Sequence, residues 1–312
     1  MQLTHDILDR LDQLEQKYAV MGQDILSYLD GLLYADYLTY WDYIHLDTLL
    51  SLQTPRTPLP DENIFIIYHQ ITELYFKLSI QAIHQLREQE VSDGALFKRQ
   101  IKRLNTYFEN LIQSFDLMVD GMDREEFLKF RMSLLPSSGF QSAQYRIIEL
   151  LSTDMELLVH PSMREQVVQP ASPESLYPML YWKSGATELA TGKKTLTLQQ
   201  FEHKYSNTFI QLGYEASHNN LYRLYLSLEK EKREEEELIH LMRQYDFNVN
   251  IRWRLAHLRS AVRYLDKKPQ VIAATGGTNW QQYLPPKNQR IVFFPELWGE
   301  DELEKWGKSV KF

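Results

Sequence analysis

The chain has 312 residues, 44% of them hydrophobic, which is enough for a sizeable core in one large or two small domains. Its net charge of −8 and the absence of a clustered basic face argue against nucleic acid as a partner. Because it contains no cysteine, disulfides, iron–sulfur clusters and cysteine nucleophiles are excluded. A metal would have to be held by histidine or carboxylate.

The composition also favours one fold class. Twelve glycines and scarce period-two alternation are typical of a helical protein, so we expect a single all-α domain over residues 1–312. The segment Met1 to Tyr18 has no apolar leader core, and no later run is long enough to cross a bilayer. A cytoplasmic protein that binds no membrane is expected.

The N-terminal third contains the clearest helical patterns. Apolar side chains recur at helical spacing over residues 6–33 with a break at Gly22, which predicts two helices. An aromatic-rich stretch over 34–52 and a proline-containing loop follow. The next helix is predicted over 62–90, and its apolar residues cover most of its circumference, so we expect it to be buried on most sides.

The middle of the chain alternates helices with breaks. A helix is predicted over 95–119, and Asp123 to Glu126 is typical of a capping box that opens a short helix ending before Pro136. Another helix is predicted from Phe140 to Leu151. Prolines and a glycine interrupt every pattern over 152–195, which predicts an irregular insertion in the helical bundle.

The last third returns to helical spacing. Helices are predicted over 197–209, 221–245 and 251–265. The charge run from Glu229 to Glu237 is typical of a solvated helix face. A small-residue turn from Thr275 to Thr278 and an apolar tail follow.

Two of the nine histidines stand out. His69 lies in the middle of the most apolar helix, and His257 follows Arg252-Trp253-Arg254. A lone histidine on an apolar face is usually a hydrogen-bonded core residue. Neither helix has the His-x-x-x-His or Glu-x-x-His spacing of a multi-ligand site, so a metal held by one histidine, as in haem, is the alternative left open.

Two pairs of side chains lie four residues apart and so share a helix face: Phe65 with His69, and Phe127 with Arg131. From this spacing alone, a core pair and an arginine extending from a helix end are the favoured explanation. The turn from Pro136 to Ser142 and the Thr275 turn favour a second interpretation. Two turns of hydroxyls and glycine beside one guanidinium could hold the carboxylate of an amino acid.

Several blocks then follow one another in the order known from one family. They are Tyr40-Trp41-Asp42-Tyr43-Ile44-His45-Leu46-Asp47, Phe65-Ile66-Ile67-Tyr68-His69-Gln70, Phe130-Arg131, Pro136-Ser137-Ser138-Gly139-Phe140-Gln141-Ser142, Arg252-Trp253-Arg254 with His257, and Thr275-Gly276-Gly277. In these blocks the chain resembles the tryptophan 2,3-dioxygenases, a family of haem enzymes. The resemblance extends from Tyr40 to the Phe-Phe-Pro-Glu-Leu tail.

The resemblance implies roles for individual residues. His257 corresponds to the axial ligand of the haem iron, and His69 to the histidine near the indole nitrogen, acting by positioning or hydrogen bonding. Arg131 corresponds to the arginine that binds the substrate carboxylate. The other implied positions are Phe65 and Phe127 at the substrate, Thr275 at its carboxylate and ammonium, Ser138 and Gly139 in the distal haem pocket, and Tyr40, Tyr43 and Ile44 entering from a neighbouring subunit.

The implied activity is the addition of both atoms of O₂ across the indole 2,3 bond of L-tryptophan, giving N-formylkynurenine. Haem b with ferrous iron is the implied cofactor, and a homotetramer is the implied assembly. Two alternatives stay open: a relative that oxidises a modified tryptophan or another indole, and a haem- or tryptophan-binding protein without turnover. Thr278-Asn279-Trp280, where the family usually has Ser-Ser-Gly, favours the first of them.

Overall fold

A computed structural model describes residues 4–88, 94–134, 139–187, 193–267, 270–271 and 284–308. The chain divides into two compact units, Met1–Thr54 and Pro55–Phe312, which are treated separately. The all-α prediction is confirmed. The strands in the described part are the two-residue pair β1 (Asp266–Lys267) and β2 (Gln270–Val271).

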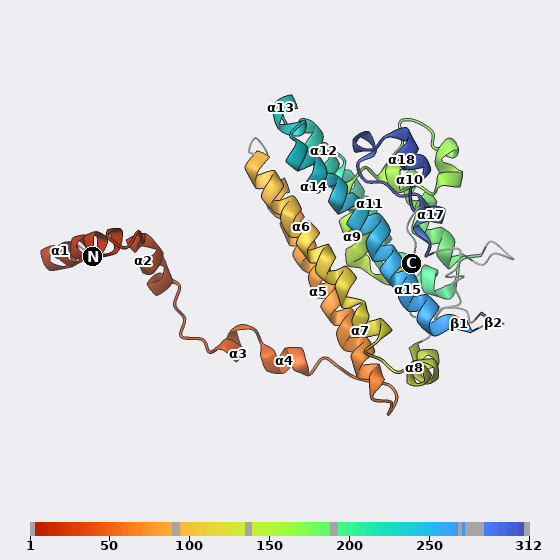
Figure 1. The fold of residues 1–312 in the computed structure, drawn as a ribbon, viewed down its shortest axis with the longest axis horizontal. Coiled ribbons are helices and arrows are strands. Elements are labelled where there is room, and N and C mark those ends of the chain that lie inside the picture. The colour runs from red at the N-terminus through yellow and green to blue at the C-terminus, as the bar shows by residue number, and fades with distance from the viewer. Residues whose placement is uncertain are drawn as a thin grey trace. The chain divides into compact units, whose positions relative to one another are not determined.

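The first unit contains four helices and buries none of its described residues. They are α1 (His5–Ala19), α2 (Ile25–Leu33), α3 (Tyr40–Tyr43) and α4 (Leu46–Leu50), so the two predicted N-terminal helices are confirmed (Figure 1). Asp24 caps α2 by accepting a hydrogen bond from the Leu26 amide. Many large apolar side chains are exposed, and Tyr37 reaches 98% exposure. A unit in which every described side chain is at least partly exposed has no hydrophobic core of its own.

The second unit is built on long helices that lie side by side (Figure 1). α5 (Asp61–Arg87) packs on α6 (Gly94–Ser114), which packs on α14 (Glu236–Phe247). α9 (Ala143–Ser152) contacts both α5 and α11 (Leu196–Ala216). Aromatic side chains fill the space between these helices: Phe76 and Phe108 contact each other, and Phe108 contacts Tyr245 edge to face.

The expectation that the helix over 62–90 is buried on most sides is wrong for the single chain. Along α5, Ile67 is 43% exposed, Leu74 48% and Leu78 42%. These three side chains share one helix face, because their spacing of seven and four residues matches the helical period. α5 thus buries one face in the core and leaves an apolar stripe open.

The start of α5 and the start of α8 (Arg124–Phe130) cap each other. Asp123 caps α8 by accepting from the Glu125 and Glu126 amides, at 2.8 and 2.9 Å. The carboxylate of Glu126 accepts from the Asp61 amide at 3.2 Å, and Asp61 accepts from the Asp123 amide at 2.5 Å. The predicted capping box therefore forms between two helices, and it joins their N-terminal ends.

Residues 152–195 form the irregular insertion that the sequence predicts. Its described part consists of short turns of helix, namely η3 (Met155–Leu158), η4 (Pro161–Gln166), α10 (Pro173–Leu176), η5 (Tyr177–Met179) and η6 (Tyr181–Ala186). Tyr177, Tyr181 and Trp182 are nevertheless buried in the core. The backbone of the insertion is therefore irregular, but its aromatic side chains belong to the packed core.

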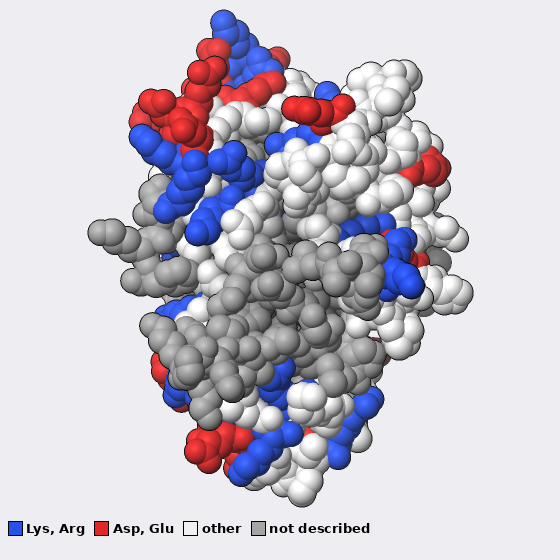
Figure 2. Space-filling view, turned by 90° about the vertical axis from the view of Figure 1, so that its right-hand side faces the viewer, with Lys and Arg blue, Asp and Glu red and all other residues white. Residues whose placement is uncertain are grey.

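Three predicted helices have wrong boundaries. The helix predicted over 197–209 continues to Ala216 in α11. The helix predicted over 95–119 ends at Ser114 and is followed by α7 (Asp116–Val119). The helix predicted over 221–245 is divided into α12 (Leu221–Ser227), α13 (Lys230–Arg233) and α14. Extended backbone at Leu228 and Glu229 separates α12 from α13. Charged side chains of both signs gather at the upper end of the face in Figure 2, the end at which α13 lies in Figure 1, as expected for a solvated charge run.

α14 continues without interruption into the helix that carries His257. A π-helical segment, η7 (Asn248–Arg252), joins it to α15 (Trp253–Leu265). The helix predicted over 251–265 is confirmed, but it is the end of a longer one. The remaining elements are α17 (Pro286–Gln289), η8 (Pro295–Leu297) and α18 (Glu300–Glu304), and no helix in the described ranges is long and apolar enough to cross a membrane.

Asp246, which is fully buried on α14, attaches the C-terminal tail to this long helix. Its carboxylate accepts from the Phe293 and Phe294 amides at 3.0 to 3.1 Å, from Trp298 Nε1 at 3.0 Å and from Asn250 Nδ2 at 2.8 Å. Burial raises the pKa of Asp246 to about 6, while these donors act in the opposite direction.

The Asp246→Asn substitution should lower the free energy of unfolding by about 1–3 kcal/mol at pH 7.5, because an amide NH₂ would face donors that lose their acceptor. Since the pKa of Asp246 in the folded protein lies above its ordinary value, the wild-type carboxyl group stabilises the fold more as the pH falls. The deficit of the variant should therefore widen by roughly 1 kcal/mol per pH unit between pH 6 and pH 4. Urea unfolding at several pH values measures both effects.

The exposed Asp120→Asn variant is the matched control and should show neither effect. A constant deficit from pH 7.5 to pH 4 would show that the raised pKa of Asp246 is wrong.

Candidate functional site

His69 and Phe65 form one wall of the site on α5. Their rings lie 4.1 Å apart between centroids, as their spacing of four residues predicts. His69 Nδ1 lies 2.7 Å from the Phe65 carbonyl oxygen. When Nδ1 donates this hydrogen bond, Nε2 is left as the free acceptor of a neutral ring.

Phe65 connects this wall to α8 through a cluster of aromatic rings. Its ring centroid lies 6.2 Å from that of Phe127 and 5.9 Å from that of Phe130. Phe127 also contacts Tyr264 of α15 at 4.6 Å. The hydroxyl of Tyr264 donates to the carbonyl oxygens of Met118 and Met122. Three helices thus meet around Phe127.

Arg131 begins the short 3₁₀ helix η1 (Arg131–Leu134), directly after α8. Its side chain is 6% exposed, and burial lowers its pKa from the ordinary arginine value. Phe130, the residue before it, contacts Phe65. Arg131, with its buried side chain, thus directly follows a residue that packs against the end of α5 carrying Phe65 and His69.

His257 lies on α15 and is half-buried. Its ring stacks on Phe115 with centroids 5.9 Å apart and an interplanar angle of 19°. Phe115 contacts Tyr68, whose ring meets His69 edge to face at 5.4 Å. The two histidines, 188 positions apart in the sequence, are thus linked through two aromatic side chains.

Both imidazoles are held neutral. Burial, together with the nearby His69, lowers the pKa of His257 to about 4, and burial likewise lowers that of His69. The side chain of His69 is nevertheless exposed at the surface of the chain. The geometry is that of two neutral imidazoles on an aromatic wall.

For the other residues that the resemblance implies, the structure gives no contact with His69 or His257 among the residues it describes. Gly139 begins the 3₁₀ helix η2 (Gly139–Gln141). Ser138 and Thr275 lie outside the described residues. Tyr40, Tyr43 and Ile44 lie in the first unit, and Tyr40 and Tyr43 are strongly exposed. Their expected contribution across a subunit boundary stays a prediction.

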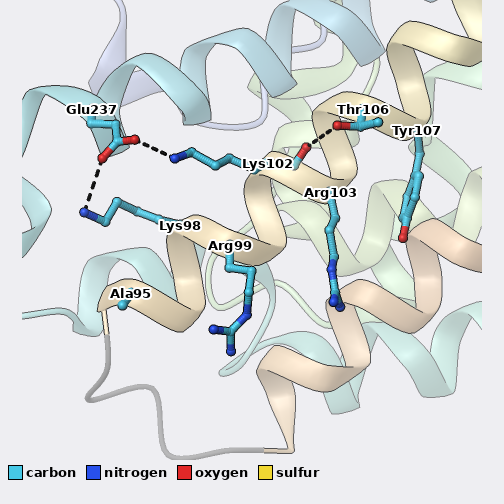
Figure 3. Close-up of a pocket in the computed structure, with 8 residues that line it drawn as sticks. All are labelled: Ala95, Lys98, Arg99, Lys102, Arg103, Thr106, Tyr107 and Glu237. Atoms are coloured by element: carbon cyan, nitrogen blue, oxygen red, sulfur yellow. Dashed lines mark hydrogen bonds and ion pairs between the residues drawn. The ribbon is translucent and has the colours of Figure 1, made fainter. Parts of the chain in front are cut away.

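A surface groove of about 530 Å³ lies elsewhere, along α6, and has a different character. Figure 3 shows Lys98 and Lys102 pointing from α6 toward Glu237 of α14, and both form ion pairs with it, at 3.4 and 2.6 Å. Exposed pairs of this kind contribute about 0–1 kcal/mol each. The groove is a solvated charged surface and contains neither histidine of the site.

Sequence reasoning missed several residues that shape the site. Phe115 stacks on His257, and Tyr68 bridges to His69, yet both read as ordinary core residues in their helices. The Arg-Trp-Arg run before His257 does mark that histidine as a candidate site residue in the sequence. It did not reveal that Arg254 is buried whereas Arg252 is only partly so.

Comparison with known proteins identifies the family of this chain. The family model "Tryptophan 2,3-dioxygenase" matches residues 32–164. A protein of that name from Bradyrhizobium diazoefficiens is 31% identical over 271 residues, covering 82% of this chain and 89% of that protein. The chain belongs to the tryptophan 2,3-dioxygenase family. Proteins of the same name from Ruegeria sp. and Pseudomonas aeruginosa are each 29% identical over 82% of this chain.

The region matched by the tryptophan 2,3-dioxygenase model contains His69, Phe65, Phe127 and Arg131, whereas His257 lies beyond it. The similarity to whole relatives covers most of the chain. The family resemblance inferred from the sequence blocks is thereby confirmed.

Proposed function

We propose that this protein is a haem-dependent dioxygenase that adds both atoms of O₂ across the indole 2,3 bond of L-tryptophan and forms N-formylkynurenine. The observation that carries the proposal is the pairing of two neutral histidines, His69 and His257, around an aromatic wall in a chain of this family. The buried Arg131, which directly follows a residue in contact with Phe65, supports an amino acid as substrate.

The side chains that could act as metal ligands fit haem better than a free metal ion. Among the described residues no group of three or more histidine and carboxylate side chains could hold a metal ion by itself. A haem iron needs one axial protein ligand, and a neutral imidazole is the common one. His257, whose pKa of about 4 keeps it unprotonated at pH 7, meets that need, and we assign it as this ligand.

Bound haem would supply a ferrous iron with an open position for O₂. The side chains have the task of placing the indole. Phe65 and Phe127 offer aromatic faces for packing, and His69 Nε2, the free acceptor, can receive the indole N–H. We assign His69 to positioning and hydrogen bonding.

We assign Arg131 to the substrate carboxylate, and the family resemblance assigns Thr275 to the same carboxylate and Ser138 and Gly139 to the haem pocket. A guanidinium binds a carboxylate through two parallel hydrogen bonds. Fixing the amino-acid end in this way limits how the indole can lie over the oxygen. Removing such a buried partner costs about 2–5 kcal/mol.

We propose a homo-oligomer, with the family's tetramer as the expected size. The first unit exposes Tyr40 and Tyr43, and α5 exposes a stripe that includes Leu74 and Leu78. Isolated soluble chains rarely leave so much apolar surface uncovered. Packing between copies would cover both, and it would bring Tyr40, Tyr43 and Ile44 to a neighbouring site.

The activity is tested by reconstituting the protein with haem, reducing it, and adding L-tryptophan under ¹⁸O₂. The proposal expects a product carrying two labelled oxygen atoms. One labelled atom would instead support a relative with different oxidation chemistry. Binding of tryptophan without any product would support a sensor.

The two histidines should respond differently to substitution. His257→Ala should abolish the absorption of histidine-ligated haem in the reconstituted protein, because the axial ligand is gone. His69→Ala should retain haem and lose most activity, because only substrate placement is affected. Absorption spectra of both variants check this, and a His257→Ala protein with wild-type haem spectra would overturn the ligand assignment.

Sites shared between subunits should allow complementation. Arg131→Ala and Tyr43→Ala should each be nearly inactive alone, with kcat/KM lowered in accordance with the loss of a buried contact. When the two variants are coexpressed, some sites combine an intact Arg131 with an intact Tyr43 from a neighbour, so activity should exceed that of either alone. The assay uses size-checked mixed oligomers, and activity no higher than the two separate variants would place Tyr43 outside the neighbour's site.

A further inference from the structure

Arg254 is a buried hub one turn before His257 on α15. Its guanidinium Nη2 donates to Glu149 at 3.2 Å, to the Tyr181 hydroxyl at 2.9 Å and to Asn250 at 2.9 Å. Its Nη1 donates to Gln289. The side chain is 6% exposed. One arginine thereby ties the start of α15 to α9, to the insertion, to the π-helical segment and to α17.

The partners of Arg254 are themselves held in place. Glu149 also pairs with Arg146 at 2.6 Å and accepts from the Tyr181 hydroxyl. That hydroxyl accepts from Arg146 at 2.8 Å. The side chains of this network are all buried: Arg254, Glu149, Arg146 and Tyr181. Each charge is therefore stabilised by these contacts and not by water. Such a network has few alternative arrangements.

A second line of hydrogen bonds reaches Arg254 along its own helix. Asn250 donates to Asp246 at 2.8 Å and accepts from Arg254, which forms a ladder of side chains spaced four residues apart. The ladder runs through the π-helical segment η7, where the register of the helix changes. Positions after that segment, His257 included, point in directions that an uninterrupted α-helix would not give them.

The ring of His257, unlike the Arg254 guanidinium, is not held by hydrogen bonds to described residues. No hydrogen bond joins it to any residue in the described ranges, and its ring contact is the stacking on Phe115. Histidine ligands usually donate their second nitrogen to a carbonyl or carboxylate, which fixes the ring. Here its direction depends on the backbone of α15 and on Phe115, and Arg254 anchors that backbone.

We infer that Arg254 is a positioning residue that sets the direction of the His257 ring toward the haem iron. This inference rests on the proposed function, since it takes His257 as the ligand. Arg254 does not touch the reacting atoms. It acts by holding the first turn of α15 against α9 and the insertion, so that the imidazole projects at one angle.

The experiment uses full-length holoprotein and reads the ligand bond directly. Resonance Raman spectra of the ferrous protein report the iron–histidine stretch, and transfer of haem to an excess of apomyoglobin gives the dissociation rate. Arg254→Met should shift or broaden the stretching band and speed haem loss about 10- to 100-fold, as the loss of a ligand's outer support does in other metal sites.

Lys183→Met is the matched control. Lys183 is also 6% exposed and pairs with Glu202 at 2.8 Å, but it belongs to the insertion and forms no hydrogen bond or ion pair with α15 among the described residues. It should alter the unfolding midpoint and leave the band and haem loss unchanged. Tyr181→Phe removes one hydroxyl from the hub at nearly constant volume, so it keeps the test available if Arg254→Met does not fold, and it should produce a smaller change in the same direction.

The outcomes separate the two proposals. A wild-type band that persists in His257→Ala would overturn the ligand assignment and with it this inference. A band that depends on His257 but is unaltered in Arg254→Met and Tyr181→Phe would overturn this inference alone. Equal changes in Lys183→Met would reduce the role of Arg254 to general stability, which also contradicts it.

Discussion

Two carboxylates buried away from water, Glu149 and Asp246, control how the second half of the fold is assembled. Neither can be tolerated in the interior without donors, because the cost of desolvating an unpaired charge is several kcal/mol. Asp246 obtains its donors from the C-terminal tail and the π-helical segment, and Glu149 obtains its donors from Arg146, Tyr181 and Arg254. Satisfying both requires one arrangement of α9, α14, α15, the insertion and the tail.

The two histidines are held in different ways, and the difference follows from their helices. His69 is fixed locally, by the carbonyl oxygen of Phe65 one turn earlier. His257 has ring stacking and an anchored backbone. The mutual caps of Asp61 and Glu126 then join α5 to α8, which brings Phe127 and Arg131 to the same end of the site. The site is thus positioned by contacts at helix ends as much as by core packing.

Apolar side chains are exposed on both units of the chain. The first unit has no buried residue in its described part, and α5 leaves Ile67, Leu74 and Leu78 exposed on roughly the opposite side of the helix from His69. Apolar area of this kind is stabilised only when another surface covers it. The helix α5 thus carries both His69 and an apolar stripe that no other described part of this chain covers.

What the sequence determined by itself was local or patterned: the all-α class, the long helix of His69, the Phe65 and His69 pair, the irregular insertion and the family. Helical period and the blocks around His69 and Arg131 are readable because they depend on neighbours in the chain. The break-up of residues 221–245, the π-helical segment before α15 and the burial of Arg254 were decided by tertiary structure. Those features depend on which distant groups, such as Glu149 and the Phe293 amide, supply partners in the interior, and sequence spacing contains no information on such pairings.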